Sequence, residues 1–336
     1  MKKADLKSRV AKATGVEHHI VGAIVDAVFH ELKEGFVTGE KMEFRGFGTF
    51  TKRTSGAKVG RVIATGDGEK LENWNGVVLL RPDPQVIWHA KRPLSKDKNL
   101  NAWYHRSETG GGAWQYLKKT PAEWTVAYKN LKFSLKPMGF KHTGLFPEQA
   151  YNWDVMIDLI KNAGRPISVL NLFGYTGGAT VACASAGASV CHVDAAKNMV
   201  ERCKENVRLS GLETAPVRYI VDDCTKFVTR EIKRGHKYDA IIMDPPSYGR
   251  GSNGEVWKLE DNLFDFVQLC TQVLSEKPLF VLINSYTTGL GATVLENILN
   301  LAMEKFEGKV EAYELCLPTD EKIMLPCGTS GMFIGK

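Results

Sequence analysis

Short hydrophobic runs alternate with helical stretches through the second half of the chain. From about Pro166 the runs are ISVLNLF, ASVCHVD, VRYIVDD, YDAIIMD, PLFVLIN, KVEAYELC and GMFIGK. Helical stretches such as AAKNMVERCKENVRL and NLFDFVQLCTQVLSE lie between them. This alternation predicts a doubly wound, mostly parallel α/β sheet, which binds ligands at the carboxyl ends of its strands. We therefore expect functional side chains directly after each strand.

Three successive strand ends carry residues suited to a nucleoside. The first is followed by NLFGYTGGAT, which is not a G-x-G-x-x-G motif, although Gly177 and Gly178 allow a tight turn toward a ligand. The second ends at Asp194, where a carboxylate can accept hydrogen bonds from a ribose diol. The third ends at Asp222–Cys224, where a carboxylate can accept the exocyclic amine of adenine. Each acid alone has a second interpretation, as a solvated loop charge or a helix cap. Together they indicate S-adenosylmethionine, a nucleoside ligand without a phosphate.

The fourth run continues into IIMDPPSYGRG, residues 241–251. Asp244 and the carbonyl of Pro245 can accept hydrogen bonds from an amine, and the two prolines hold both groups rigidly. Tyr248 is a candidate platform for a flipped base. In the alternative interpretation, Asp244 contacts only the cofactor and Tyr248 serves packing.

These motifs resemble a known enzyme family. VLNLFGYTGG, HVDAAKNMVERCKENVRLSG, VDDCTKF and MDPPSYGRG are similar to the class I methyltransferase family that contains the bacterial large-subunit rRNA cytosine-C5 and guanine-N7 methyltransferases. HTGLFPEQAYNW resembles the segment that precedes the first strand there and closes over the cofactor. The resemblance covers about residues 65–336 and implies a Rossmann-like seven-stranded methyltransferase sheet.

The resemblance also implies roles for single residues. Phe173, Tyr175, Thr176 and Gly177 would wrap the methionine part of the cofactor. Asp194 would hold the ribose, and Asp223 with the backbone of Cys224 would hold the adenine. Gln149 would belong to the closing segment. Asn171 departs from the family, in which an acid is commoner at this strand end; its amide can still bond the methionine amine, without a charge pair.

The acceptor atom is predicted from a missing thiol. A ring carbon such as cytosine C5 becomes nucleophilic only after a thiolate adds to the neighbouring carbon, and in the C5-modifying relatives that thiol follows the fifth strand. Here the corresponding stretch is VLINSYTTG, which has no cysteine, and neither Cys270 nor Cys316 is at that strand end. A nitrogen already has a lone pair and needs only orientation. The sequence therefore favours methylation of a nitrogen.

Residues 62–140 contain tryptophans among short β-like runs and predict a small antiparallel β-rich lobe. Pro82 and Pro84 would confine its first strand to an edge or end it. The lobe has side chains that could stack on unpaired bases or hold phosphates, although we favour the interpretation that most of the tryptophans belong to its core. These candidates are Trp88, Trp103, Trp114, Trp124, Arg81, Lys91, Arg92 and Arg106.

The first 61 residues predict two amphipathic helices, broken at Thr14-Gly15, and a hairpin around Gly46 and Gly48. With GEKMEFRGFGTFTKRTSGAKVGR, they resemble the bacterial nucleoid proteins HU and IHF, but that resemblance stops after Arg61, before the family's DNA-embracing arm. The resemblance implies a homodimer. Weak DNA binding is the alternative role, through phosphate contacts of Lys52, Arg53, Lys58 and Arg61.

Charge and cysteine content limit the remaining classes. The formal net charge of the chain is +6, and residues 1–61 hold 12 Lys and Arg against 7 Asp and Glu, so most of the excess lies there. Seven cysteines with no C-x-x-C pair predict reduced thiols, no zinc site and a cytoplasmic protein. No apolar run is long enough for a membrane span, and MKKADLKSRV is not followed by the apolar region of a signal peptide.

The sequence as a whole predicts an S-adenosylmethionine-dependent methyltransferase with no metal ion, acting on a base nitrogen in nucleic acid, with RNA favoured over DNA. The predicted domains are an HU-like segment over residues 1–61, the β-rich lobe over 62–140 and the methyltransferase domain over 141–336. Two alternatives stay open at this point: an architectural DNA-binding protein with the catalytic fold as a passenger, and a methyltransferase of proteins or small molecules.

Overall fold

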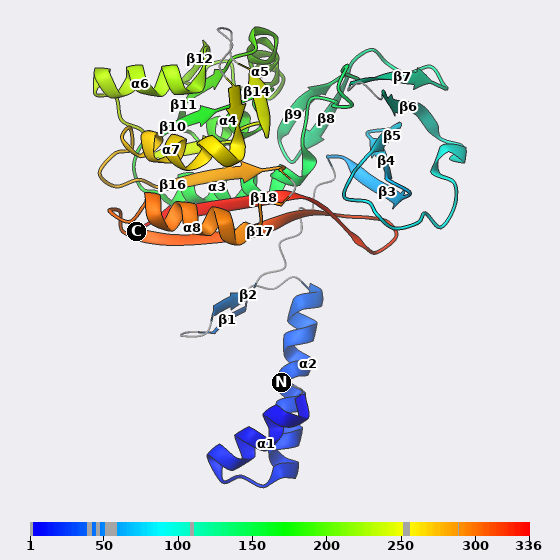
Figure 1. The fold of residues 1–336 in the computed structure, drawn as a ribbon, viewed down its shortest axis with the longest axis vertical. Coiled ribbons are helices and arrows are strands. Elements are labelled where there is room, and N and C mark those ends of the chain that lie inside the picture. The colour runs from blue at the N-terminus through cyan, green and yellow to red at the C-terminus, as the bar shows by residue number, and fades with distance from the viewer. Residues whose placement is uncertain are drawn as a thin grey trace. The chain divides into compact units, whose positions relative to one another are not determined.

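The computed structural model describes residues 3–38, 42–44, 48–50, 59–107, 111–250, 256–287 and 289–336. The chain forms two compact units, Met1–Arg53 and Thr54–Lys336 (Figure 1). The domain boundaries predicted at residues 61 and 140 stay predictions. Of the basic residues proposed for DNA contact, Lys52, Arg53 and Lys58 lie outside the described residues.

The first unit contains the predicted helices and hairpin. Helices α1 (Lys3–Thr14) and α2 (His18–Thr38) are separated at Gly15, whose φ of 71° ends α1 in a left-handed turn. Strands β1 (Met42–Phe44) and β2 (Gly48–Phe50) pair antiparallel, and Gly46 lies outside the described residues. Lys3 and Lys7 of α1 both form ion pairs with Asp26 of α2, which joins the two helices.

A seven-stranded sheet forms the centre of the second unit and confirms the predicted fold class. Its order is β12-β11-β10-β13-β16-β18-β17. The first five strands run parallel, and β18 lies antiparallel to both β16 and β17. The strands are β10 (Ser168–Leu172), β11 (Ser189–Asp194), β12 (Val217–Val221), β13 (Ala240–Met243), β16 (Phe280–Ser285), β17 (Gly308–Pro318) and β18 (Met324–Gly335).

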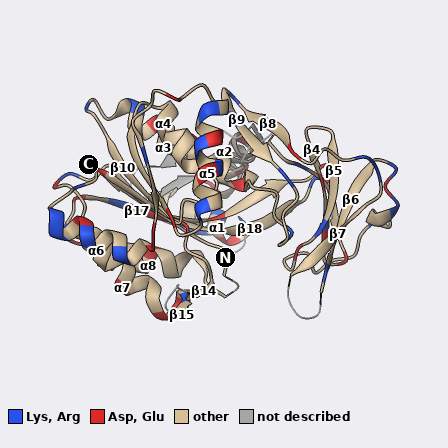
Figure 2. Ribbon diagram, turned by 90° about the horizontal axis from the view of Figure 1, so that it is seen from above, with Lys and Arg blue, Asp and Glu red and all other residues tan. Residues whose placement is uncertain are grey.

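Helices cover both faces of this sheet (Figure 1). They are needed because successive side chains of a strand point to opposite faces, and here both faces are apolar. Val169 of β10 packs with α3 (Ala150–Asn162), α4 (Gly178–Ser185) and α5 (Lys197–Leu209). Leu170 points to the other face, with α6 (Cys224–Arg234), α7 (Leu259–Thr271) and α8 (Ala292–Ala302). Charged residues lie along the helices α5 and α6 (Figure 2). The central strands β10, β13 and β16 contain none. None of the helices in the described residues is long and apolar enough to span a membrane.

The small lobe is built on a five-stranded sheet in the order β3-β4-β5-β6-β7, beside the separate hairpin β8-β9. Strand β5 ends at Pro82 as predicted, but it lies inside the sheet between β4 and β6 rather than at an edge. The lobe strands are β3 (Arg61–Gly66), β4 (Glu69–Trp74), β5 (Val77–Pro82), β6 (Leu100–Arg106), β7 (Gly112–Tyr116), β8 (Trp124–Tyr128) and β9 (Leu131–Leu135).

Two details of the lobe differ from the prediction. Strands β5 and β6 are parallel, because a long connection containing the 3-10 turn η1 (Leu94–Lys96) returns the chain to the starting end of β5. Strands β3 and β4 were not predicted, although Asp67-Gly68 and Asn75-Gly76 are hairpin signals, and all four residues have the positive φ that such turns need.

Several of the proposed base and phosphate ligands make contacts inside the second unit instead. Arg81, proposed for phosphate contact, instead forms a buried two-pronged pair with Glu72, at 2.6 Å from Nε and 2.9 Å from Nη2. Burial alone would raise the pKa of Glu72, but the charges of Arg81 and Lys70 lower it to about 2. Trp103 donates to Glu69, Trp114 to the carbonyl of Met138. These contacts favour the packing interpretation of the tryptophans.

Two other proposed phosphate ligands form ion pairs at the surface. Arg92 is paired with Asp97, and Arg61 forms a two-pronged ion pair with Asp320, at the turn between β17 and β18. The backbone of Val62 also bridges to Thr319 beside this pair. Arg61 therefore fastens the lobe to the long β17–β18 hairpin.

Candidate functional site

The carboxyl ends of β10, β11 and β13 meet at one edge of the sheet. Leu172 pairs in register with Val193 on one side and with Met243 on the other, so the residues that follow all three strands are neighbours. A cavity of about 620 Å³ opens at this edge, within the size range of small-molecule sites. One wall comes from these strand ends and the other from the small lobe.

The turn after β10 places two non-glycine residues in a strained backbone conformation. Phe173 and Tyr175 have φ values of 54° and 50°, which cost non-glycine residues about 1–3 kcal/mol each. Gly177 follows with a φ of 82°, and a Cβ at this position would lie 2.2 Å from Sγ of Cys203. The chain thus needs glycine at 177, and the turn brings Phe173 and Tyr175 to the cavity.

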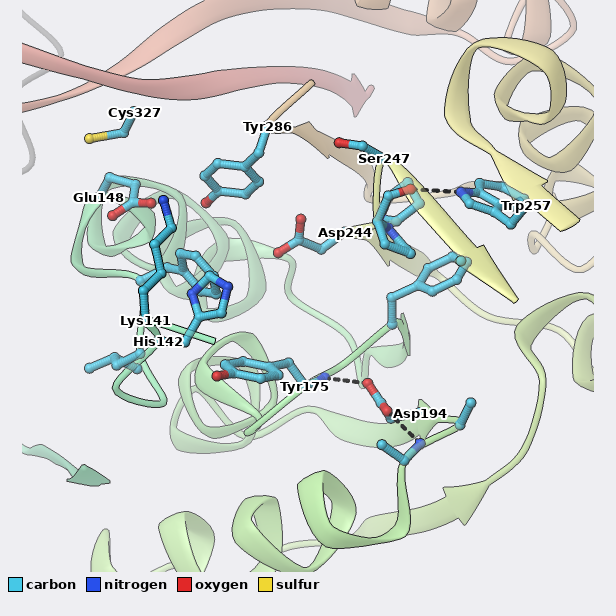
Figure 3. A pocket seen from close by; sticks show the side chains of 18 of the residues that line it. Lys141, His142, Glu148, Tyr175, Asp194, Asp244, Ser247, Trp257, Tyr286 and Cys327 are labelled. Carbon is cyan, nitrogen blue, oxygen red and sulfur yellow. Dashed lines mark hydrogen bonds between the residues drawn. The ribbon is translucent and has the colours of Figure 1, made fainter. Parts of the chain in front are cut away.

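Asp194 holds this turn in place. One of its oxygens accepts a hydrogen bond from the backbone of Tyr175 and the other from that of Ala196, both at 2.8 Å (Figure 3). Burial raises the pKa of Asp194, and these two backbone bonds oppose the rise. Each carboxylate oxygen keeps a further lone pair, and the residue lines the cavity, so the pair of oxygens can accept a ribose diol.

The third strand end divides its two acids between structural roles. Asp223 caps α6, because its side chain accepts the backbone N–H of Lys226 at 2.9 Å. Asp222 is paired with Arg230. Asp223 and Cys224 nevertheless line the cavity, beside the rings of Phe173 and Trp257, which are 5.7 Å apart. This wall offers one acid and flat apolar surface, a combination suited to adenine.

Asp244 faces the same cavity from the end of β13, and Pro245 beside it is buried. Burial, followed by the negative charge of Glu148, raises the pKa of Asp244 to about 7. Tyr248 is placed differently from the prediction: its side chain is 52% exposed and does not line this cavity. The reason is the alternation along β14 (Tyr248–Arg250), which pairs with β15 (Val256–Lys258); Gly249 and Trp257 face the cavity instead.

The remaining predicted residues line a smaller adjoining pocket. Gln149, Asn171 and Thr176 all border it, together with Asp244. Asn171 is buried and donates to Oγ1 of Thr180 at 2.9 Å, which leaves its carbonyl oxygen available. The structure therefore brings the side chains predicted to hold the cofactor to two adjoining pockets. Gly177 packs against Cys203 instead.

Several residues of the cavity were not predicted as site residues. Glu148 and Tyr286 line the same cavity as Asp244, with the Tyr286 hydroxyl on the side of Glu148, and Lys141 and His142 lie beside them (Figure 3). Glu148 and His142 belong to the closing segment HTGLFPEQAYNW, and Tyr286 belongs to VLINSYTTG, so the sequence did offer a signal for them. Other residues of the cavity come from separate elements, and no motif marked them. These include Lys70, Asp83, Trp257 and Cys327.

Comparison with known proteins identifies the fold's chemistry. Residues 52–289 match the family model described as S-adenosylmethionine-dependent methyltransferase. The chain belongs to this family. The crystal structure of the SAM-dependent methyltransferase from Agrobacterium tumefaciens is 34% identical, with a TM-score of 0.79 over 84% of this chain and 92% of that one. The family resemblance and the cofactor predicted from the sequence are confirmed.

Two further relatives and a second family model add detail. The ribosomal RNA large subunit methyltransferase K/L of Shewanella frigidimarina is 31% identical over 44% of this chain, which spans 20% of that protein's length. The crystal structure of SMU.776, complexed with SAH, shares the fold at 18% identity, with a TM-score of 0.65 over 83% of this chain and 76% of that one. Residues 1–82 match the bacterial DNA-binding protein model, past the end expected at Arg61.

The cavity fits the cofactor of this methyltransferase. Its residues offer a carboxylate at Asp194 and an apolar wall at Phe173 and Trp257. S-adenosylmethionine, when bound, supplies an electrophilic methyl group on a sulfonium. The residues that line the two pockets would hold its two ends and exclude water around it.

Replacing Asp194 by Ala should weaken S-adenosylmethionine binding by about 10–100-fold, because hydrogen bonds to a charged group are worth about 1.5–3 kcal/mol. Isothermal titration calorimetry measures this change. Asp265→Ala, at an exposed position on α7, is the matched control and should bind as the wild type does. Equal affinities for the two variants would contradict the assignment of Asp194.

The pKa of Asp244 predicts a pH dependence that distinguishes two ligands. Below about pH 7 its carboxyl becomes neutral, and it can no longer attract a positive sulfonium. Affinity for S-adenosylmethionine should therefore fall with decreasing pH, by at most about tenfold per unit. S-adenosylhomocysteine has a neutral sulfur and should change little, and Asp244→Asn should make the two pH profiles parallel. Parallel profiles in the wild type would count against this location of Asp244.

Proposed function

We propose that this methyltransferase transfers the methyl group to a nitrogen of an RNA base, with ribosomal RNA as the first acceptor to test. The observation that supports it most is the carboxyl of Asp244, which faces the cavity. Its pKa is raised by burial and by the charge of Glu148, and no hydrogen bond from the described residues contributes to that shift. An amine N–H is the donor such a carboxyl needs, and Pro245 keeps it rigid. A nitrogen lone pair aligned in this way requires no covalent activation.

The cysteines of the cavity support nitrogen over carbon. Cys224 and Cys327 are the two that line it among the described residues, and Sγ of Cys224 already accepts the backbone N–H of Phe173. Burial, and for Cys327 also the charge of Glu148, raises the thiol pKa well above its ordinary value. A protonated thiol is a poor nucleophile, so the C5 route lacks its first step.

The acceptor class rests on the relatives. Those named ribosomal RNA large subunit methyltransferase K/L support RNA rather than DNA, although this chain spans only a fifth of their length. The base platform predicted at Tyr248 is better supplied within the cavity. The ring centroids of Phe146 and Tyr286 are 5.3 Å apart, and both residues line the cavity. We call the part of the cavity lined by these two rings and Asp244 its acceptor side.

Mass spectrometry of rRNA nucleosides from cells with and without the gene tests this proposal. We expect one N-methylated nucleoside to disappear in the deletion and to return with the wild-type gene, but not with Asp244→Ala. Cys327→Ser should reduce the rate less than about tenfold, whereas loss of a true nucleophile costs orders of magnitude more. Loss of a C-methylated nucleoside, or inactivity of Cys327→Ser, would establish the carbon route. An unchanged rRNA profile would favour a protein or small-molecule acceptor.

We also infer that the first unit pairs with a second copy of the chain through α2. Val16, Ile20, Ile24, Val28 and Phe29 are exposed apolar residues, and Ile20, Ile24 and Val28 repeat at the four-residue spacing of one helix face. The match to bacterial DNA-binding proteins supports this role. Sedimentation should give a dimer for the wild type and a monomer for Ile24→Glu, with the exposed Glu31→Lys as control. A monomeric wild type would exclude the pairing.

A further inference from the structure

Two carboxyl groups from separate elements converge at the acceptor side of the cavity. Asp244 follows β13, and Glu148 belongs to the 3-10 turn η2 (Pro147–Gln149), where it is 5% exposed. Both side chains point into the pocket, and the hydroxyl of Tyr286, after β16, lies between them in the view of Figure 3. Asp244 has a role in the proposed function, whereas Glu148 has none so far.

A buried network of amides keeps η2, and therefore Glu148, against the sheet. Gln149 donates to the Tyr286 hydroxyl at 2.8 Å and accepts from Nδ2 of Asn152, also at 2.8 Å. The same nitrogen of Asn152 lies 3.2 Å from Oδ1 of Asn284 and 3.0 Å from Oγ of Ser330. These residues come from α3, β16 and β18, so the position of Glu148 depends on three elements of the fold.

The neighbouring groups affect the pKa values of Glu148 and Asp244 differently. Burial raises the pKa of Glu148 above its ordinary value, and the charge of Lys70 and a hydrogen bond from Tyr286 limit the rise. Burial and the charges of Glu148 and Asp244 raise the pKa of Tyr286, which keeps it a phenol that can donate this bond. Asp244 has only burial and the charge of Glu148 acting on it, and both raise its pKa. Lys70 and Tyr286 thus stabilise a negative charge on Glu148, whereas both influences on Asp244 favour its protonated form and raise its pKa to about 7.

Apart from Lys141, the other charged groups named here are held in ion pairs. Lys70 lies 3.1 Å from Asp83 and 3.6 Å from Glu72, and Glu72 also holds Arg81. Lys141 donates to the carbonyl of Pro82. Burial, followed by the charge of Arg81, lowers the pKa of His142 to about 4, so this imidazole is neutral near pH 7. Cys327, on β18, stays a thiol. Glu148 is thus the charged group that acts on Asp244.

We propose that Glu148 is a positioning residue for proton transfer: its charge, fixed beside Tyr286, makes Asp244 the group that takes the proton released by the methylated nitrogen. This inference rests on the proposed nitrogen acceptor. The nitrogen lone pair forms the new N–C bond, and the methyl–sulfur bond breaks with both electrons remaining on sulfur. The nitrogen then loses its proton to the Asp244 carboxylate, which passes it to water. A base whose pKa lies near the working pH is suited to this step.

The test is a direct titration that needs no acceptor. Carboxyl carbon-13 NMR of aspartate-labelled full-length protein, with Asp244→Asn to assign the signal, should give a midpoint near pH 7. In Glu148→Gln the midpoint should move to lower pH by roughly one unit, the usual effect of removing a close like charge. Glu148→Asp keeps the charge and should restore most of the shift. The acid limb of the pH–rate profile should move in the same direction in Glu148→Gln.

An Asp244 midpoint that is the same in Glu148→Gln and the wild type would overturn the proposal. If Glu148→Gln fails to fold, labelled glutamate in the wild type decides, with Glu148→Asp to assign the signal: Glu148 must ionise before Asp244, and the opposite order would also overturn it. Methylated RNA with an unmoved Asp244 midpoint would reject the role of Glu148 alone. A shifted midpoint without any methylated RNA base would reject the acceptor alone.

Discussion

Parallel pairing of β10 with β11 on one side and β13 on the other is the constraint on which the site depends. It fixes the register Leu172–Val193 and Leu172–Met243, so the turn at 173–177, Asp194 and Asp244 emerge at one edge. A shift by one residue would turn every side chain of a strand to the opposite face, and the two apolar cores prevent it. The packing of the sheet therefore determines the geometry of the cofactor site.

The small lobe gives this edge its chemistry by covering it. Lys70, Arg81 and Asp83 line the cavity from the lobe, and their charges are balanced in ion pairs, with Glu72 behind Arg81. Because the lobe keeps water away, burial is the first cause of the raised pKa of Asp244, Glu148 and Tyr286. The long β17–β18 hairpin attaches the lobe through Arg61 and Asp320. The lobe thus affects the site by desolvating it more than by supplying ligands.

Where local rules and the fold disagree, the site explains the difference. Phe173 and Tyr175 adopt a conformation that neither residue prefers, and Asp194 stabilises it through the backbone of Tyr175. At Gly177, in contrast, the residue type suits the backbone conformation, and Cys203 leaves no room for a side chain there. The glycine could be recognised from YTGG, but the strained phenylalanine and tyrosine could not, because propensity alone argues against them.

The sequence by itself determined the seven strands and the residues that follow each strand end, because a short hydrophobic run and the period of a helix are local properties. It therefore identified Asp194, Asp223 and Asp244. Only the tertiary structure decided that Tyr248 points away, that Arg81 is buried against Glu72, and that Glu148, Tyr286 and Cys327 share one cavity. Those facts depend on which distant segments meet, and on the burial that results, and neither is written in any local stretch of residues.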